Sequence, residues 1–146
     1  MPNDIQIRLV EITDIQGIKL LVDELENTNS DAAIFASIFH DYLLDPNSLM
    51  YVAENNAGHL LAFISCRGHR LLHHQGMVFE IQELIVTMAE QGKGIGRALI
   101  NQVREEVHRR GAKSLEVTSN KRRKEAHAFY QSVGFRNSHE KFTIYF

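Results

Sequence analysis

The sequence lacks most of the features that mark secreted, membrane or multidomain proteins. Its 146 residues include one cysteine, Cys66, so no internal disulfide can form and we expect a protein of the reducing cytoplasm. No apolar run approaches the roughly 20 residues that cross a bilayer, and the start, Met1–Asp4, does not resemble a signal peptide, so we expect no membrane association. With two prolines and no linker-like tract, the chain is expected to form one domain, residues 1–146.

Strong charge of either sign is also lacking, because the net charge is −2. This value argues against a strongly basic nucleic-acid binder. The charge is nevertheless unevenly distributed. Residues 1–50 contain two basic and nine acidic residues, a net charge of −7, whereas residues 51–146 contain fourteen basic and nine acidic residues, a net charge of +5. A chain polarised in this way is expected to have one cationic and one anionic partner.

Apolar periodicity predicts a mixture of strands and helices. Alternation and short apolar runs predict strands at 5–10, 50–54, 60–66, 77–86 and 114–119. Helical spacing predicts helices at 15–25, 31–44, 95–107 and 121–133. A capping-box pattern at Thr13–Gln16 is expected to start the first helix, and the alternation of Phe142, Ile144 and Phe146 predicts a final strand. Because hairpins dominate, we expect an α+β fold with a mixed, mostly antiparallel sheet flanked by helices.

The strongest local feature is a glycine-rich loop between a predicted strand and a predicted helix. Its residues are Gln91, Gly92, Lys93, Gly94, Ile95, Gly96 and Arg97. Glycines let backbone N–H groups approach a ligand, and a helix N-terminus adds unpaired donors and a positive dipole, which favours a pyrophosphate or another anion. The Walker A pattern and the dinucleotide fingerprint do not match, because each needs a residue that is missing here. A turn that merely starts a helix is the alternative interpretation.

The loop and the segments around it resemble the GCN5-related N-acetyltransferases, the GNAT family. The segments similar to the acyl-CoA loop and the final helix motif of that family are Glu83–Val86, Gln91–Gly96, Ser119–Asn120, Ala126–Tyr130 and Val133–Phe135. The resemblance covers roughly residues 60–135. It departs from the family at Thr87–Met88, where many members place a proline.

Within the family, further segments resemble the aminoalkylphosphonate N-acetyltransferases. They are Asp45–Asn47, Leu72–His74, Glu80–Leu84, Ala126–Tyr130, Ser138–His139 and Phe142–Thr143. The resemblance implies transfer of the acetyl group of acetyl-CoA to the primary amine of a small molecule, with an aminoalkylphosphonate as the leading acceptor. Polyamines, aminoglycosides and protein amines are the alternatives, and a non-catalytic acyl-CoA-binding module is the competing class.

The resemblance also implies where acetyl-CoA binds. The donor lies between the strands that end near Val86 and Ser119. Cofactor-binding roles then belong to Leu84, Ile85 and Val86, to the whole loop from Gln91 to Arg97, and to Asn120, Lys124 and Phe129. The basic run Lys121–Lys124 opens a predicted helix, where positive charge opposes the helix dipole. We therefore interpret this run as a site for the 3′-phosphate of CoA rather than as a solvated face.

The chemistry calls for a base and an acid. A primary amine has a pKa of about 10.4 and must lose a proton before it attacks. Glu83 and Glu80 are the candidates for the base, Glu83 being nearer the acetyl end, and solvated glutamates are the alternative. Tyr130 matches the tyrosine that the family places near the departing sulfur, although a tyrosine on an apolar helical stripe is often a core residue. Asn120 either caps the final helix or contacts pantetheine.

Histidines raise the question of a metal. On a strand, the neighbours His73 and His74 would point to opposite faces and could not bind one ion without distortion. We expect both to bind substrate and predict no metal-ligating residue. A divalent metal that recruits a phosphonate, held by a histidine with Glu80 or Glu83, remains an alternative.

The sequence contains few indications of the oligomeric state. Dimers are common among the proteins that this chain resembles. The predicted C-terminal strand would also leave an edge open to a second copy. We therefore expect a homodimer.

Overall fold

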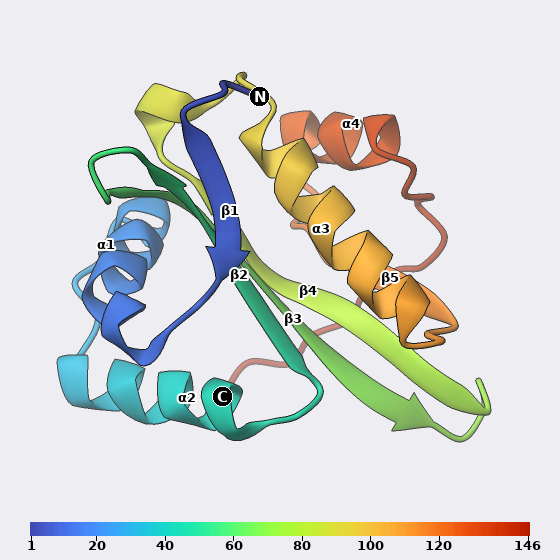
Figure 1. Ribbon diagram of the computed structural model, residues 1–146. Helices are drawn as coiled ribbons and strands as arrows, with labels where there is room; N and C mark the ends of the chain where they lie inside the picture. Colours follow the sequence, from blue (N-terminus) through green and yellow to red (C-terminus); the bar gives the residue numbers. More distant parts are fainter.

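A five-stranded sheet forms the centre of the computed structural model, which describes residues 1–146 (Figure 1). The strands are β1 (Ile5–Leu9), β2 (Ser48–Asn55), β3 (Leu60–Leu71), β4 (Gly76–Val86) and β5 (Ser114–Val117). They lie in the order of the chain, and every neighbouring pair is antiparallel except β4 and β5, which are parallel. The predicted α+β class with a mixed, mostly antiparallel sheet is confirmed.

Helices cover both faces of this sheet (Figure 1). The four α-helices are α1 (Ile15–Glu26), α2 (Ala32–Leu44), α3 (Ile95–Arg109) and α4 (Lys124–Ser132), and two short 3-10 helices are η1 (Ile12–Asp14) and η2 (Met88–Glu90). On one face α1 and α2 pack with Ile18, Leu21 and Phe39 against Phe63 and Ile85 of the sheet. No helix combines the length and the apolar character that a bilayer-spanning segment requires.

The other face is covered mainly by α3. The side chains predicted to share one stripe, Ile95, Leu99, Val103 and Val107, are all at most 3% exposed and pack against the sheet. Cys66 lies in the same core, fully buried, and burial raises the pKa of its thiol to about 12.

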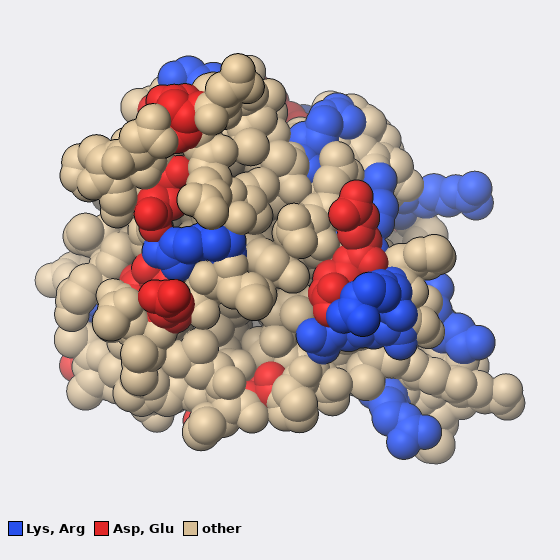
Figure 2. All heavy atoms as spheres, in the orientation of Figure 1, with Lys and Arg blue, Asp and Glu red and all other residues tan.

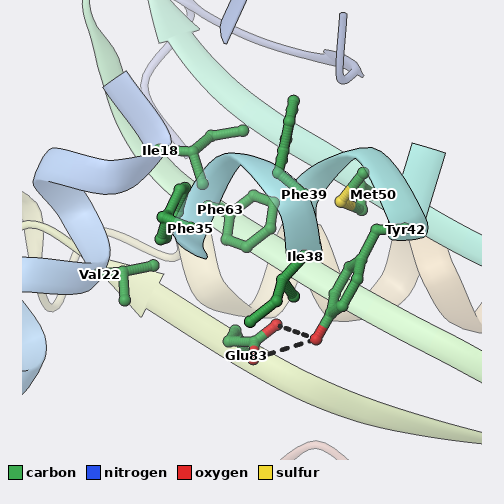
Figure 3. A pocket seen from close by; sticks show the side chains of 9 residues that line it. All are labelled: Ile18, Val22, Phe35, Ile38, Phe39, Tyr42, Met50, Phe63 and Glu83. Atoms are coloured by element: carbon green, nitrogen blue, oxygen red, sulfur yellow. Dashed lines mark hydrogen bonds between the residues drawn. The ribbon is translucent and has the colours of Figure 1, made fainter. Parts of the chain in front are cut away.

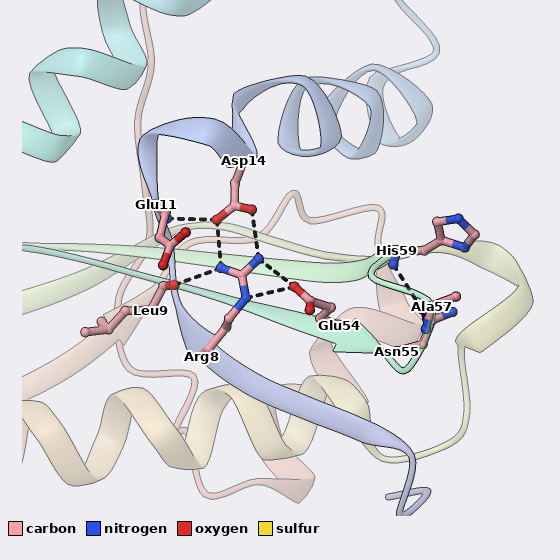
Figure 4. A network of polar contacts seen from close by, with 8 residues as sticks. All are labelled: Arg8, Leu9, Glu11, Asp14, Glu54, Asn55, Ala57 and His59. Atoms are coloured by element: carbon pink, nitrogen blue, oxygen red, sulfur yellow. Dashed lines mark hydrogen bonds and ion pairs between the residues drawn. The ribbon is translucent and has the colours of Figure 1, made fainter.

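A charged network fastens β1 to the start of α1 (Figure 4). The Arg8 guanidinium donates to both carboxylate oxygens of Asp14 at 2.8 Å and to Glu54 at 2.8 Å. Asp14 is 8% exposed and also accepts from the backbone N–H of Glu11. The predicted capping box at Thr13–Gln16 is therefore wrong. Residues 12–14 form η1, and the Asp14 carboxylate accepts hydrogen bonds from the N–H of Glu11 and from Arg8.

Two expectations about the C-terminal region are also wrong. The last helix begins at Lys124 rather than at residue 121, because the Asn120 side chain accepts from the N–H of Arg122 and closes a turn first. Residues 135–146 form no strand. An alternating sequence forms a strand only where a neighbouring strand pairs its backbone groups, and no strand of the sheet pairs with this segment. Phe142 and Ile144 are consequently 89% and 82% exposed.

Candidate active site

A gap opens in the sheet between β4 and β5. The two strands pair only from Val78 to Ile81, opposite Ser114 to Val117, although β4 continues to Val86. Beyond Ile81 the edge of β4 that faces the gap therefore has no strand partner. Just past the end of β5, the Ser119 hydroxyl is buried without a hydrogen-bond partner. The gap thus offers unpaired polar groups to an extended ligand, and the predicted residues Leu84–Val86 lie along it.

The glycine-rich loop lies at the N-terminus of α3. Gly92 and Gly94 have φ angles of +81° and +86°, a conformation that other residues adopt only with strain. The N–H groups of residues 93–97 donate to no backbone carbonyl, because they precede or begin the helix. The side chain of Gln91 closes the loop by donating to the Val86 carbonyl at 3.2 Å. This geometry suits an anion.

Cations surround the loop, but not all are free. Lys93 pairs with Glu90 at 3.0 Å, and Arg97 donates to Ser132 at 3.4 Å. None of the seven ion pairs in the structure includes a residue of the run Lys121–Lys124. The basic side chains at the start of α4 therefore make no ion pair within the protein, as expected of a segment that faces an anionic ligand.

Aromatic residues of α4 pack next to the loop. Gly96 lies so close to Phe129 and Val86 that a Cβ there would come within 3.4 Å and 3.7 Å of their side chains. Tyr130 packs between Phe129 and Phe135, with ring centroids 5.5 and 5.8 Å away. A tyrosine phenol is protonated at neutral pH, and burial raises the pKa of Tyr130 further.

A β-bulge in β4 brings both candidate bases to one face. Ser65 of β3 pairs with Glu83, and the next residue, Cys66, pairs with Ile81, so Gln82 is the extra residue. Strict alternation would place Glu80 and Glu83 on opposite faces, since they are three residues apart. With the bulge, both lie on the face covered by α1 and α2.

The surroundings of the two glutamates differ. Glu83 accepts a hydrogen bond from the Tyr42 hydroxyl at 3.2 Å (Figure 3). It also accepts from the Ser65 hydroxyl, and its own N–H donates to Ser65 at 3.0 Å. Burial and the charge of Glu83 raise the pKa of Tyr42 to about 12, so Tyr42 remains a donor. Glu80 accepts instead from Thr118 and Gln82, both at 3.1 Å. Glu83 is thus held in one orientation by two hydroxyls.

An apolar pocket lies in front of Glu83 (Figure 3). It has a volume of about 210 Å³ and is lined by Ile18, Val22, Phe35, Ile38, Phe39, Tyr42, Met50, Phe63 and Glu83. Glu83 is its one charged lining residue. The guanidinium of Arg67 lies over the Tyr42 ring, 4.9 Å from the centroid, and pairs with Asp45 at 2.9 Å. The pocket can therefore hold a cationic group at Glu83 and an aliphatic chain along its walls.

The predicted histidines lie elsewhere. His73 and His74 belong to the turn at 72–75 between β3 and β4, at the opposite end of β4 from Glu83, with ring centroids 4.2 Å apart. The expectation that they sit on a strand is wrong, because the hairpin turns there. No three His, Cys, Asp or Glu side chains are grouped to hold a metal ion.

Sequence reasoning missed Tyr42, Ser65 and Arg67. The one available signal was the position of Tyr42 near the end of an apolar helix. Nothing in the sequence indicated that this helix end reaches β4.

The sequence matches the acetyltransferase (GNAT) family over residues 16–135. An aminoalkylphosphonate N-acetyltransferase of Salmonella typhimurium is 34% identical over 138 residues, which cover 94% of this chain and 89% of that protein. A transcriptional regulator from Bacillus halodurans has a similar structure, with a TM-score of 0.89, 23% identity and coverage of 97% of this chain and 99% of that one. For an acetyltransferase of Trypanosoma brucei the TM-score is 0.84 at 19% identity, covering 98% of this chain and 100% of that one. These two structures show a shared fold.

Proposed function

This chain belongs to the GNAT family of acetyltransferases, and we propose that it acetylates the primary amine of a small aminoalkylphosphonate. The observation that supports this most is the position of Glu83, an oriented carboxylate in a small apolar pocket beside the gap in the sheet. The relative from Salmonella typhimurium, which has this activity by name, supports the phosphonate.

Members of the family use acetyl-CoA, which supplies an activated thioester when bound. The residues present fit this donor, because the edge of β4 beyond Ile81 and the buried Ser119 hydroxyl lack partners. Leu84–Val86 would bind the pantetheine arm, and the loop 91–97 would bind the pyrophosphate with its N–H groups. Lys124 and its basic neighbours would bind the 3′-phosphate.

Two side chains would move the protons. Glu83 would accept the proton that the acceptor ammonium must lose, because the neutral amine is the nucleophile. Tyr130 would donate its phenolic proton to the departing sulfur, so that a C–N bond replaces the C–S bond and a thiol leaves. A non-catalytic acyl-CoA-binding module would need neither residue.

The pocket also supports a small acceptor with a single ammonium group. A polyamine would need a second carboxylate for its second ammonium group, yet Glu83 is the one charged residue that lines the pocket. An aminoglycoside is much larger than a cavity of about 210 Å³ would enclose. A short amine with one methylene chain suits the apolar walls.

An acceptor panel tests the activity. Thiol release from acetyl-CoA would be measured with aminoalkylphosphonates, polyamines, aminoglycosides and peptides, with added divalent metal and with chelator. We expect the highest kcat/KM with an aminoalkylphosphonate. Tight CoA binding without turnover on any amine would contradict the proposal and favour the binding module.

A matched pair of variants tests the base. We expect Glu83→Gln to lower kcat by about a hundredfold or more, because the amide cannot accept the proton. Glu80→Gln removes a carboxylate from the same strand face and should lower kcat much less. Equal losses in the two variants, compared over a pH series, would contradict the assignment of Glu83 as the base.

A further inference from the structure

We infer that Arg67 binds the anionic end of the acceptor and selects amines that contain a phosphonate, phosphate or carboxylate group. The inference rests on the proposed function and adds a specificity-determining residue to it.

Arg67 and Glu83 both contact Tyr42, Glu83 at its hydroxyl and Arg67 over the face of its ring. The Tyr42 hydroxyl is 3.2 Å from the Glu83 carboxylate, while the Arg67 guanidinium carbon lies 4.9 Å from the centroid of the same ring. Ser65, which holds Glu83, is two residues before Arg67 on β3, so both side chains point to the same face of the sheet. A cation and a carboxylate therefore flank the same tyrosine on one face of the sheet.

Arg67 keeps donor capacity beyond its ion pair. A guanidinium has five N–H donors. In this structure Nη2 donates to Asp45 at 2.9 Å, and Nε is buried without a partner. The other oxygen of Asp45 accepts from the N–H of Asn47, so this carboxylate is shared between two donors. The side chain of Arg67 is 31% exposed and lies over Tyr42, which lines the pocket, so a ligand that extends past Tyr42 can reach it.

The arrangement matches a molecule charged at both ends. With the amine at Glu83, a short methylene chain would lie along Tyr42 and the apolar wall, and the anion would reach Arg67. Planar guanidinium groups bind oxyanions through paired hydrogen bonds, which makes this end of the site selective. A polyamine would instead place a second cation against Arg67 and be repelled.

Arg67 also has an obvious structural role, because its pair with Asp45 connects the end of α2 to β3. The test must separate this role from ligand binding. Two acceptors of matched length serve this purpose, aminoethylphosphonate and propylamine, whose kcat/KM ratio measures selectivity for the anion.

We expect Arg67→Met to lower that ratio by about 10- to 100-fold, the effect of losing a hydrogen bond to a charged group. Arg67→Lys, which keeps the charge, should recover part of the ratio. Asp45→Asn breaks the same ion pair but removes the competing carboxylate, so the ratio should stay the same or rise. Thermal unfolding of each variant reports the structural contribution separately.

Three outcomes would overturn the inference. They are an unchanged ratio in Arg67→Met, a ratio that falls equally in Arg67→Met and Asp45→Asn, and a wild type that prefers propylamine. In that last case acetyl transfer itself is still observed and the proposed function survives in its broader form. A wild type that acetylates neither amine nor any other member of the panel overturns both.

Discussion

At the scale of single residues, the environment of Tyr130 determines what it can do. Its half-buried ring packs against Phe129 and Phe135, and burial raises the pKa of the phenol. A phenol of ordinary pKa, about 10, already holds its proton at neutral pH, and burial moves the pKa of Tyr130 further in that direction, so the proton is present when the sulfur departs.

Replacing Tyr130 with phenylalanine removes the proton and keeps the packing. We expect kcat to fall by about a hundredfold. The KM for acetyl-CoA should change less than twofold, because the ring still fills its place between Phe129 and Phe135. Steady-state kinetics with a saturating acceptor measure both constants. An unchanged kcat would exclude Tyr130 as the acid.

Some residues of the candidate site could be predicted from the sequence, and others could not. Tyr130, the glutamates of β4 and the loop could be located, because local motifs with distinct spacing contain them. The choice between Glu80 and Glu83 could not be made, since it depends on the bulge at Gln82 and on contacts from β3 and α2. Arg67 was missed because its partners are distant in sequence.

At the scale of elements, the loop before α3 depends on backbone conformation. Gly92 and Gly58 provide a matched pair, because both have a φ of +81° and open space where a Cβ would lie. Gly58 lies in the β2–β3 turn and Gly92 in the loop at the α3 N-terminus. Alanine at either position introduces the same backbone strain in a different place.

We expect Gly92→Ala to raise the KM for acetyl-CoA by about 5- to 30-fold, since left-handed backbone costs an L-residue about 1–2 kcal/mol. Gly58→Ala should destabilise the fold by a similar amount and leave this KM unchanged. Kinetics and thermal unfolding of both variants provide the check. Equal KM values in the two variants would mean that the loop does not bind the cofactor.

Element boundaries show why local pattern is an incomplete guide. The stripe of α3 is predicted well because its periodicity and its burial coincide. The strand expected at 142–146 fails because a strand exists only beside another strand, and the sequence alone does not show which edges are within reach.

At the scale of the whole molecule, the Arg8 network joins β1, β2 and the start of α1 (Figure 4). The hydrogen bonds from Arg8 lower the pKa of Asp14, against the opposing effect of burial. A lowered folded-state pKa means that the stabilisation is complete above the ordinary carboxyl pKa. It is lost as the pH falls through the folded-state value.

We expect Asp14→Asn to lower the free energy of unfolding at pH 7 by about 2 kcal/mol, because Arg8 loses its charged acceptor. The difference from the wild type should shrink as the pH falls through the folded-state pKa of Asp14. Urea unfolding at a series of pH values measures it. A difference that does not depend on pH would contradict this account.

The apolar tail leads to a prediction about assembly. Phe142, Ile144 and Phe146 are at least 82% exposed, which is costly for a monomer in water. We expect the wild type to be a dimer and a variant with serine at these three positions to be a monomer. Light scattering over a range of concentrations distinguishes them, and a monomeric wild type would contradict the prediction.

The uneven charge of the chain has a spatial counterpart. Most Lys and Arg side chains visible in Figure 2 lie over the side of the molecule that bears α3 and α4, whereas acidic side chains are the more prominent on the side with β1 and α1. The same separation divides the proposed sites, with the loop and α4 on the basic side and the acceptor pocket against α1 and α2.

Gln82 has a consequence for how this protein could change during evolution. A bulge bends its strand, and β4 leaves β5 directly after Ile81, next to the extra residue. Losing the single codon for Gln82 would keep Glu80 and Glu83 on their present face, now in regular alternation. It would also straighten β4 and let it pair further with β5. One in-frame deletion would thus keep Glu83 in the acceptor pocket and close the gap between β4 and β5 in which the acetyl donor is proposed to bind. The donor site could then be lost while the acceptor pocket remains.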